Sequence, residues 1–297
     1  MPARKWLIGQ HLCGWPRAAE QDDPVVLAEP LEVLLSGKDM RGNDKWYRNF
    51  GVSRVLGCVF LFACTWPSFA SAEDCVVLLH GWGRTSHSMQ KLANAVEDAG
   101  FRALNLDYPS RRASVAELAE SVFAEVWDTC GTAHEVHVVA HSMGGILVRQ
   151  YFAEHDEARL GRVVMLGTPN QGTEAVNKLL HLPGLAWVLG PAGRTLGRGE
   201  DYIPQRLPPV NFELGIIAGT QKLNPLLSLL VENPDDGTVS VAATEVEGMC
   251  SHLVLPVTHS LMMRNDEVIA QTLYFLREGR FSAPAARNGL CRHRQRH

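Results

Sequence analysis

The ten residues VHVVAHSMGG, at positions 136–145, decide the fold of this chain. The apolar run that ends at Ala140 is typical of a buried strand, and the sequence from Gly145 onward reads as a helix. Ser142 lies in the turn between them. The turn is so tight that residues two before and two after the serine have to be small, as Ala140 and Gly144 are. This is the pattern of a nucleophile elbow, with alanine in place of the more usual first glycine.

The alternation of strand and helix continues on both sides of Ser142. Apolar patterning predicts six strands, at residues 75–80, 101–107, 135–140, 162–167, 213–219 and 252–257. Helices are predicted after most of them, including one that begins with the capping box of Ser114 and Glu117 and a closing one at residues 266–278. We therefore expect an α/β fold, with a mostly parallel sheet of about six strands and helices on both faces.

Composition agrees with a globular protein. The chain has 297 residues, of which 46% are hydrophobic and 20% charged, and its formal net charge is −4. Nothing in this balance indicates nucleic-acid binding, and no internal repeat is present.

Residues 75–281 resemble the α/β-hydrolases, and among them the small secreted bacterial lipases and esterases. The resemblance is carried by His80-Gly81-Trp82-Gly83, Ala140-His141-Ser142-Met143-Gly144-Gly145, Asp236-Gly237-Thr238-Val239 and a late His259. The order serine, acid, histidine is that of the family. It implies a serine hydrolase that cleaves carboxylic esters, in a minimal form without the two leading strands of larger members.

Each motif has a chemical task. Ser142 would attack the acyl carbon once a base takes its proton, and the resemblance makes His259 that base. His252 is the rival, but it begins the strand that His259 follows, and we expect it at the opposite edge of the sheet. Asp236 would orient the histidine, while the adjacent Asp235 is the alternative acid.

The negative charge that develops on the substrate needs two backbone N–H groups. Met143, directly after the serine, is expected to supply one, and Trp82 in the loop after the first strand the other. His80 would orient that loop, and His141 is expected to pack in the elbow.

Residues 172–210 do not fit the sheet pattern, because an apolar patch is interrupted by glycines and prolines. They are either a small apolar cap over Ser142, with Leu185 and Trp187 among the acyl contacts, or an excursion that completes the core. A cap would suit an apolar acyl chain and a transient contact with a membrane or lipid surface.

The N-terminal part reads as a targeting segment. The uncharged residues 55–72 follow Lys45, Arg48 and Arg54 and end in Ala70-Ser71-Ala72, which is typical of a signal peptide. This segment lies further from the first residue than an ordinary signal peptide does.

We therefore expect an upstream extension at residues 1–39, a signal peptide at 40–72 and the hydrolase domain at 73–281. An uncleaved membrane anchor at residues 55–72 is the alternative, and a lipoprotein cysteine is disfavoured.

Export leaves four cysteines after residue 72. Four cysteines allow three connectivities. Cys75 opens the first strand and Cys130 ends the helix before the third, and these segments begin at the same edge of the sheet, so a disulfide between the two is one expectation. Residues 282–297 read as a disordered basic tail.

The sequence thus predicts an exported, periplasmic or extracellular, ester hydrolase, and it indicates no cofactor and no metal site, while metal dependence stays open. An amidase, thioesterase or acyltransferase on the same site stays open, as does a non-catalytic binding module of this fold.

Overall fold

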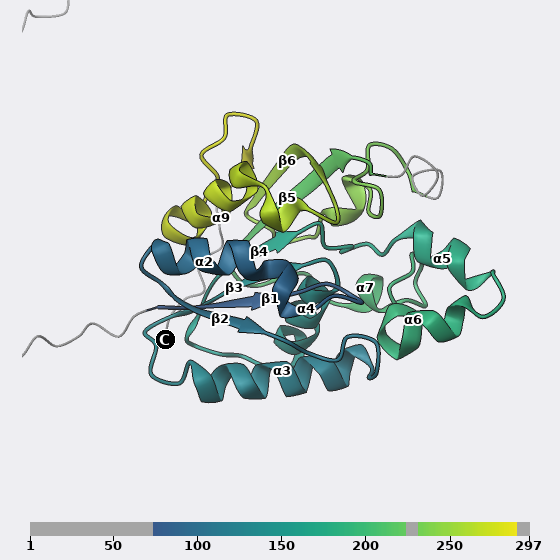
Figure 1. Cartoon of the computed structure of the whole chain (residues 1–297), viewed down its shortest axis with the longest axis horizontal. Coiled ribbons are helices and arrows are strands. Elements are labelled where there is room, and N and C mark those ends of the chain that lie inside the picture. Colours follow the sequence, from purple (N-terminus) through teal and green to yellow (C-terminus); the bar gives the residue numbers. More distant parts are fainter. Residues whose placement is uncertain (1–73, 224–230, 290–297) are drawn as a thin grey trace, which may run out of the picture. The chain divides into compact units, whose positions relative to one another are not determined.

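The structure is a computed structural model that describes residues 74–223 and 231–289. Its centre is one sheet in the order β2-β1-β3-β4-β5-β6-β7 (Figure 1). The first six strands are parallel, and only β7 is antiparallel. The strands are β1 Cys75–Leu79, β2 Arg102–Leu106, β3 Val136–His141, β4 Leu160–Leu166, β5 Leu214–Gln221, β6 Ser251–Thr258 and β7 Arg287–Asn288. All six predicted strands are confirmed.

Helices cover both faces of the sheet, as predicted. They are η1 Ser86–Met89, α2 Gln90–Asp98, α3 Val115–Thr129, α4 Met143–Glu154, η2 Ala242–Thr244, η3 Met262–Arg264 and α9 Asp266–Glu278. One apolar core joins α3 and α4 to the sheet, and a second core joins α2 and α9 to its other face. Since side chains alternate along a strand, Val77 points into the first core and Val76 into the second.

Local sequence explains where the covering helices begin. The Ser114 side chain accepts the Glu117 backbone N–H, and Glu117 accepts the Ser114 N–H in return, so the predicted capping box at the start of α3 is confirmed. At α9, Asn265 caps the Val268 N–H.

A cap of three short helices lies between β4 and β5 in the chain. These helices are α5 Glu174–Leu180, α6 Leu185–Gly193 and α7 Ile203–Arg206. In Figure 1, α5 and α6 lie beyond the carboxyl ends of β1 and β2. Ligands of open parallel sheets bind at that edge.

The predicted disulfide is confirmed. Cys75 at the start of β1 is bonded to Cys130 at the end of α3, with Cα atoms 6.0 Å apart. Both residues are fully buried. Cys250 is also disulfide-bonded.

The folded domain extends beyond the expected boundary at residue 281. Residues 287 and 288 pair with β6, and the Asn288 side chain bonds both the N–H and the carbonyl of Phe281. The expectation of a disordered tail was therefore wrong for residues 282–289. Residues 290–297 and the N-terminal segments, including the expected signal peptide, lie outside the described residues.

No helix in the described ranges is long and apolar enough to cross a membrane.

Candidate active site

Ser142 lies at the end of β3 and immediately before α4, with backbone angles φ 54° and ψ −122°. It is the only residue other than glycine with a positive φ in the described part of the chain. Such a backbone is strained for a residue with a Cβ and persists only where the surroundings fix it. Here the Ser142 N–H donates to the Leu166 carbonyl at 2.9 Å, which ties the turn to β4.

Small neighbours make the turn possible. A Cβ at Gly144 would lie 2.9 Å from the Leu79 carbonyl oxygen, and a Cβ at Gly145 would overlap the Thr168 side chain. Ala140 is completely buried. The sequence requirement for small residues around Ser142 therefore has a packing cause at each of these positions.

The structure brings Ser142, His259 and Asp236 together. His259 follows β6, and its Nε2 lies 3.0 Å from Ser142 Oγ, while its Nδ1 lies 2.7 Å from Asp236 Oδ2. The other carboxylate oxygen of Asp236 accepts the backbone N–H groups of Thr238 and Val239 at 3.0 and 2.8 Å. Each side chain is thus held in place by its neighbour.

The two rival residues are engaged elsewhere. Asp235 pairs with Lys222, with Nζ 2.9 Å from Oδ2, and also accepts the Gly237 N–H. His252 bonds Thr244 Oγ1 and Arg287, each at 2.9 Å. Burial, together with the nearby Arg287 charge, lowers the pKa of His252 to about 4. Neither residue contacts Ser142.

His141 has a role that the sequence did not indicate. Burial lowers its pKa well below the usual value, so the ring is neutral. Its Nε2 lies 2.9 Å from the His259 carbonyl oxygen, which makes this nitrogen the donor. The two rings also lie 4.8 Å apart between centroids. His141 therefore holds the loop that carries His259.

His80 supports the loop after β1, as expected. Its Nδ1 lies 2.8 Å from the Gly81 carbonyl, and its Nε2 accepts the Tyr108 N–H at 3.3 Å. Burial lowers the pKa of this histidine too. The Tyr108 ring stacks on it at 4.1 Å.

Trp82 and Met143 are both close to the serine. Trp82 lines the same cavity as Ser142, and a Cβ at Gly81 would lie 3.0 Å from Ser142 Cβ. Met143 is the first residue of α4, where helical N–H groups have no partner within the helix. Within residues 74–223 and 231–289, neither backbone N–H has a hydrogen-bond acceptor. The Trp82 indole donates to the Leu189 carbonyl at 2.8 Å, a contact that no sequence pattern signals.

The cavity above Ser142 has a volume of about 400 Å³. Five apolar cap side chains line it: Ala175, Val176, Leu179, Leu189 and Leu196. The insertion therefore covers the serine, as the cap interpretation expected. Two residues were assigned wrongly, because Leu185 and Trp187 do not line this cavity, and Trp187 is 84% exposed. Residues two apart on a helix lie on nearly opposite sides, so Leu189 faces inward and Trp187 outward.

Among the described residues no group of three His, Cys, Asp or Glu side chains is placed to hold a metal.

Comparison with known proteins agrees with this architecture. The family model of the alpha/beta hydrolase fold matches residues 74–190. The chain thus has the α/β-hydrolase fold.

Among solved structures, the mature form of lipase BlEst2 from Bacillus licheniformis is similar, with a TM-score of 0.56 and 16% identity over 69% of this chain and 92% of that one. Its propeptide form gives a TM-score of 0.55 and 18% identity over 68% of this chain and 50% of that one. No curated protein matches the chain. The likeness to lipases is therefore one of fold at low identity.

Proposed function

We propose that the protein is a serine hydrolase of carboxylic esters, with Ser142 as nucleophile, His259 as base and Asp236 as the acid that orients it. One observation carries the proposal. Ser142 Oγ, His259 and Asp236 form a continuous hydrogen-bonded chain, with contacts of 3.0 and 2.7 Å, at the floor of an apolar cavity. This is the geometry in which a serine hydroxyl becomes a nucleophile.

The first half of the reaction forms an acyl-enzyme. His259 Nε2 takes the hydroxyl proton as Ser142 Oγ bonds the acyl carbon, and the carbonyl oxygen becomes an oxyanion. The N–H groups of Trp82 and Met143 stabilise that oxyanion, since neither has another acceptor among the described residues. His259 then gives its proton to the departing alcohol oxygen as the carbon–oxygen bond breaks.

In the second half, water replaces the alcohol. His259 takes a proton from the water as its oxygen attacks the acyl carbon, and returns that proton to Ser142 Oγ as the acid leaves. Asp236 stabilises the charged imidazole in both halves through the 2.7 Å contact with Nδ1. No step needs a metal or a cofactor.

The lining of the cavity favours an apolar acyl group. Leu179, Leu189 and Leu196 come from the cap, so the acyl chain would lie between the cap and the sheet edge. Each buried methylene contributes at most about 0.8 kcal/mol. A cavity that accepts several methylenes should therefore separate substrates by chain length.

The test has two arms. A fluorophosphonate probe should label the wild type at Ser142 and fail to label Ser142→Ala, and hydrolysis of p-nitrophenyl esters should be lost in the same variant. Nitrophenyl esters of rising chain length, measured beside a matched amide and thioester, identify the leaving group. His252→Ala is the matched control and should keep turnover.

Labelling of Ser142 without turnover of any ester would replace esterase by amidase, thioesterase or acyltransferase, according to the substrate consumed. Absence of both labelling and turnover in correctly folded protein would leave the non-catalytic binding module.

We also propose that the protein is exported and cleaved after Ala72. The signal-like pattern at residues 40–72 motivates this, and the Cys75–Cys130 disulfide supports it because disulfides persist in oxidising compartments. The mature N-terminus should be Glu73. Recovery of a longer chain in the membrane fraction would favour the anchor at residues 55–72 instead.

A further inference from the structure

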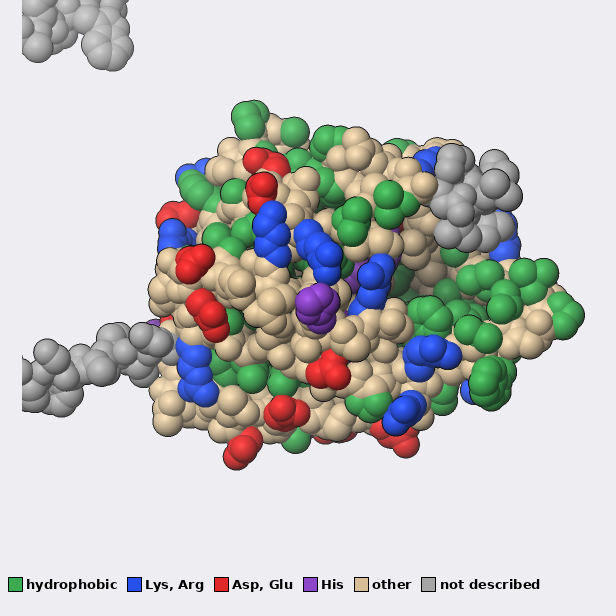
Figure 2. All heavy atoms as spheres, in the orientation of Figure 1, with side chains coloured by type: hydrophobic (Ala, Val, Ile, Leu, Met, Phe, Trp, Pro, Cys, Tyr) green, Lys and Arg blue, Asp and Glu red, His purple; other side chains and the backbone are tan. Residues whose placement is uncertain are grey.

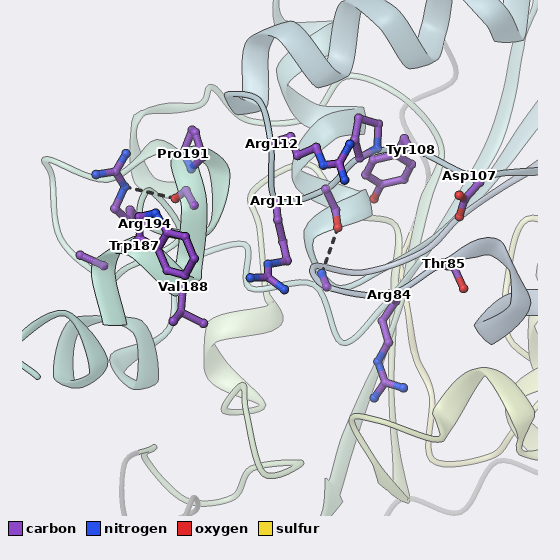
Figure 3. A pocket seen from close by; sticks show the side chains of 15 residues that line it. Arg84, Thr85, Asp107, Tyr108, Arg111, Arg112, Trp187, Val188, Pro191 and Arg194 are labelled. Carbon is purple, nitrogen blue, oxygen red and sulfur yellow. Dashed lines mark hydrogen bonds between the residues drawn. The ribbon is translucent and has the colours of Figure 1, made fainter. Parts of the chain in front are cut away.

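A second hollow adjoins the cavity above Ser142. Its volume is about 1120 Å³, and Gly83 and Arg84 line both spaces. The loop after β1, the loop between β2 and α3, and the cap helix α6 form its walls (Figure 3). The two spaces therefore share part of a wall at the loop that carries Trp82. We call the second one the arginine groove.

Arginines from three separate segments line this groove. Arg84 follows the Trp82 loop, Arg111 and Arg112 precede α3, and Arg194 follows α6. In the view of Figure 3, Arg111 lies between Trp187 of the cap and Arg84, Arg84 and Arg111 extend in the same direction, and Arg112 extends toward Tyr108. All four arginines are exposed.

Their charges are not neutralised by described side chains. Arg162, Arg198 and Arg287 each pair with a glutamate, whereas none of the four groove arginines forms an ion pair within residues 74–223 and 231–289. The one acidic residue of the lining is Asp107, which accepts the Ser86 N–H at 2.9 Å. Several like charges around one hollow attract an anion to it.

Arg111 contacts the Trp82 ring and packs against the cap. Its guanidinium carbon lies 5.7 Å from the centre of the Trp82 ring, a cation–π contact. Its backbone carbonyl packs against Gly190, where φ is 67° and an added Cβ would overlap that oxygen. Arg111 therefore lies beside Trp82, which itself lines the Ser142 cavity.

We propose that the arginine groove is a subsite for a phosphate group carried on the alcohol part of the ester substrate. The inference rests on the proposed function. The apolar acyl chain occupies the cavity under the cap, and the alcohol extends past Gly83 and Arg84 into the groove. The planar guanidinium binds phosphate oxygens through two parallel N–H bonds, which makes arginine suited to this anion.

The surroundings of the groove suit an amphiphile. Figure 2 shows hydrophobic side chains gathered over the cap and Lys and Arg side chains across the adjoining face. Trp187 and Val188 border the groove and are both exposed. The products of hydrolysis would be a carboxylic acid and a phosphorylated alcohol, and water is the only co-reactant.

The test compares two esters that differ only in the phosphate, 1-octanoylglycerol 3-phosphate and 1-octanoylglycerol, both as monomers in solution. We expect wild-type kcat/KM to be at least about tenfold higher for the phosphorylated ester at low salt, since charged hydrogen bonds of this kind contribute that much. The ratio should fall as ionic strength rises.

Variants locate the effect. Arg84→Gln and Arg111→Gln should each lower the ratio of kcat/KM for the two esters about tenfold. Arg111→Lys should lower this ratio less, because lysine keeps the charge but lacks the two parallel N–H donors of the guanidinium. Arg280→Gln is the control, because this exposed arginine contacts Tyr274 at the end of α9 and should leave the ratio unchanged.

A wild-type ratio near one, with normal ester hydrolysis, would overturn the subsite and leave the proposed function intact. Loss of turnover of both esters would remove the proposed function, and the subsite with it. Vesicles of phosphatidylglycerol and phosphatidylcholine distinguish the source of the phosphate. If the arginine variants lose activity only on vesicles, the groove binds a lipid surface rather than the substrate, and the proposal is wrong.

Discussion

Replacing Asp236 with asparagine alters the proposed triad while preserving the shape of its loop. One carboxylate oxygen of Asp236 accepts the N–H groups of Thr238 and Val239, and the other lies 2.7 Å from His259 Nδ1. Asparagine has one oxygen and one NH₂ group. Two backbone donors require the oxygen, so the NH₂ group has to face His259.

The histidine then carries its proton on the wrong nitrogen. With a donor in front of it, Nδ1 becomes the acceptor and the ring proton moves to Nε2, which lies 3.0 Å from Ser142 Oγ. An N–H in that place cannot take the hydroxyl proton. We expect kcat to fall roughly 10⁴-fold, the loss typical of this change in a Ser-His-Asp triad. The corresponding rise in the barrier is about 5.4 kcal/mol.

The assay is the rate of p-nitrophenyl octanoate hydrolysis at neutral pH, with the thermal midpoint measured on the same samples. Asp235→Asn is the matched control. It weakens the 2.9 Å ion pair with Lys222 and should lower the thermal midpoint, while kcat per folded molecule stays within about tenfold of wild type. The reasoning is refuted if Asp236→Asn keeps a tenth of the wild-type kcat, or if Asp235→Asn is inactive and fully stable.

Three further results are expected. Activity should rise from acetyl to octanoyl esters, and Leu189→Asn should flatten the rise whereas Trp187→Asn should not, because only Leu189 lines the cavity; equal slopes would contradict this. Replacing Cys75 and Cys130 with alanine removes a cross-link that spans 55 residues, and should lower the free energy of unfolding by about 4 kcal/mol in urea titrations. Burial lowers the pKa of His252 to about 4, so the unfolded chain takes up its proton first as the pH falls. Wild type should lose up to about 3 kcal/mol from this group between pH 6.5 and 4, and His252→Gln should lose correspondingly less; identical pH dependence would contradict the shift.

The fold was predictable because its determinants are local. The strands are short apolar runs buried on both faces of a parallel sheet, and β1 and β3 are buried along their whole length. The seventh strand was missed for the opposite reason. Arg287 and Asn288 are polar and exposed, and they join the sheet through pairing with β6 rather than through burial.

The positions of the proposed triad were also predictable, because each residue follows a strand or a marked turn. The preference for Asp236 over Asp235 rested on the resemblance alone, since neighbouring carboxylates point in different directions only after the loop has folded. Which cap side chains face the cavity was harder still to predict. Residues 172–210 carry apolar side chains all round α6, so the sequence could not tell Leu189, which faces the cavity, from Trp187, which faces out.

The contact of Trp82 with the cap would make substrate recognition and the proposed catalysis interdependent. Its backbone N–H is a proposed oxyanion donor, and its indole is tied to the Leu189 carbonyl of the cap at 2.8 Å. An acyl group too large for the cavity would push Leu189 outward and carry Trp82 with it. Such a substrate would still bind, but the donor would be displaced as charge develops. Esters that fit the cavity poorly should therefore show a lower kcat rather than weaker binding. The cap would then select the acyl chain at the chemical step.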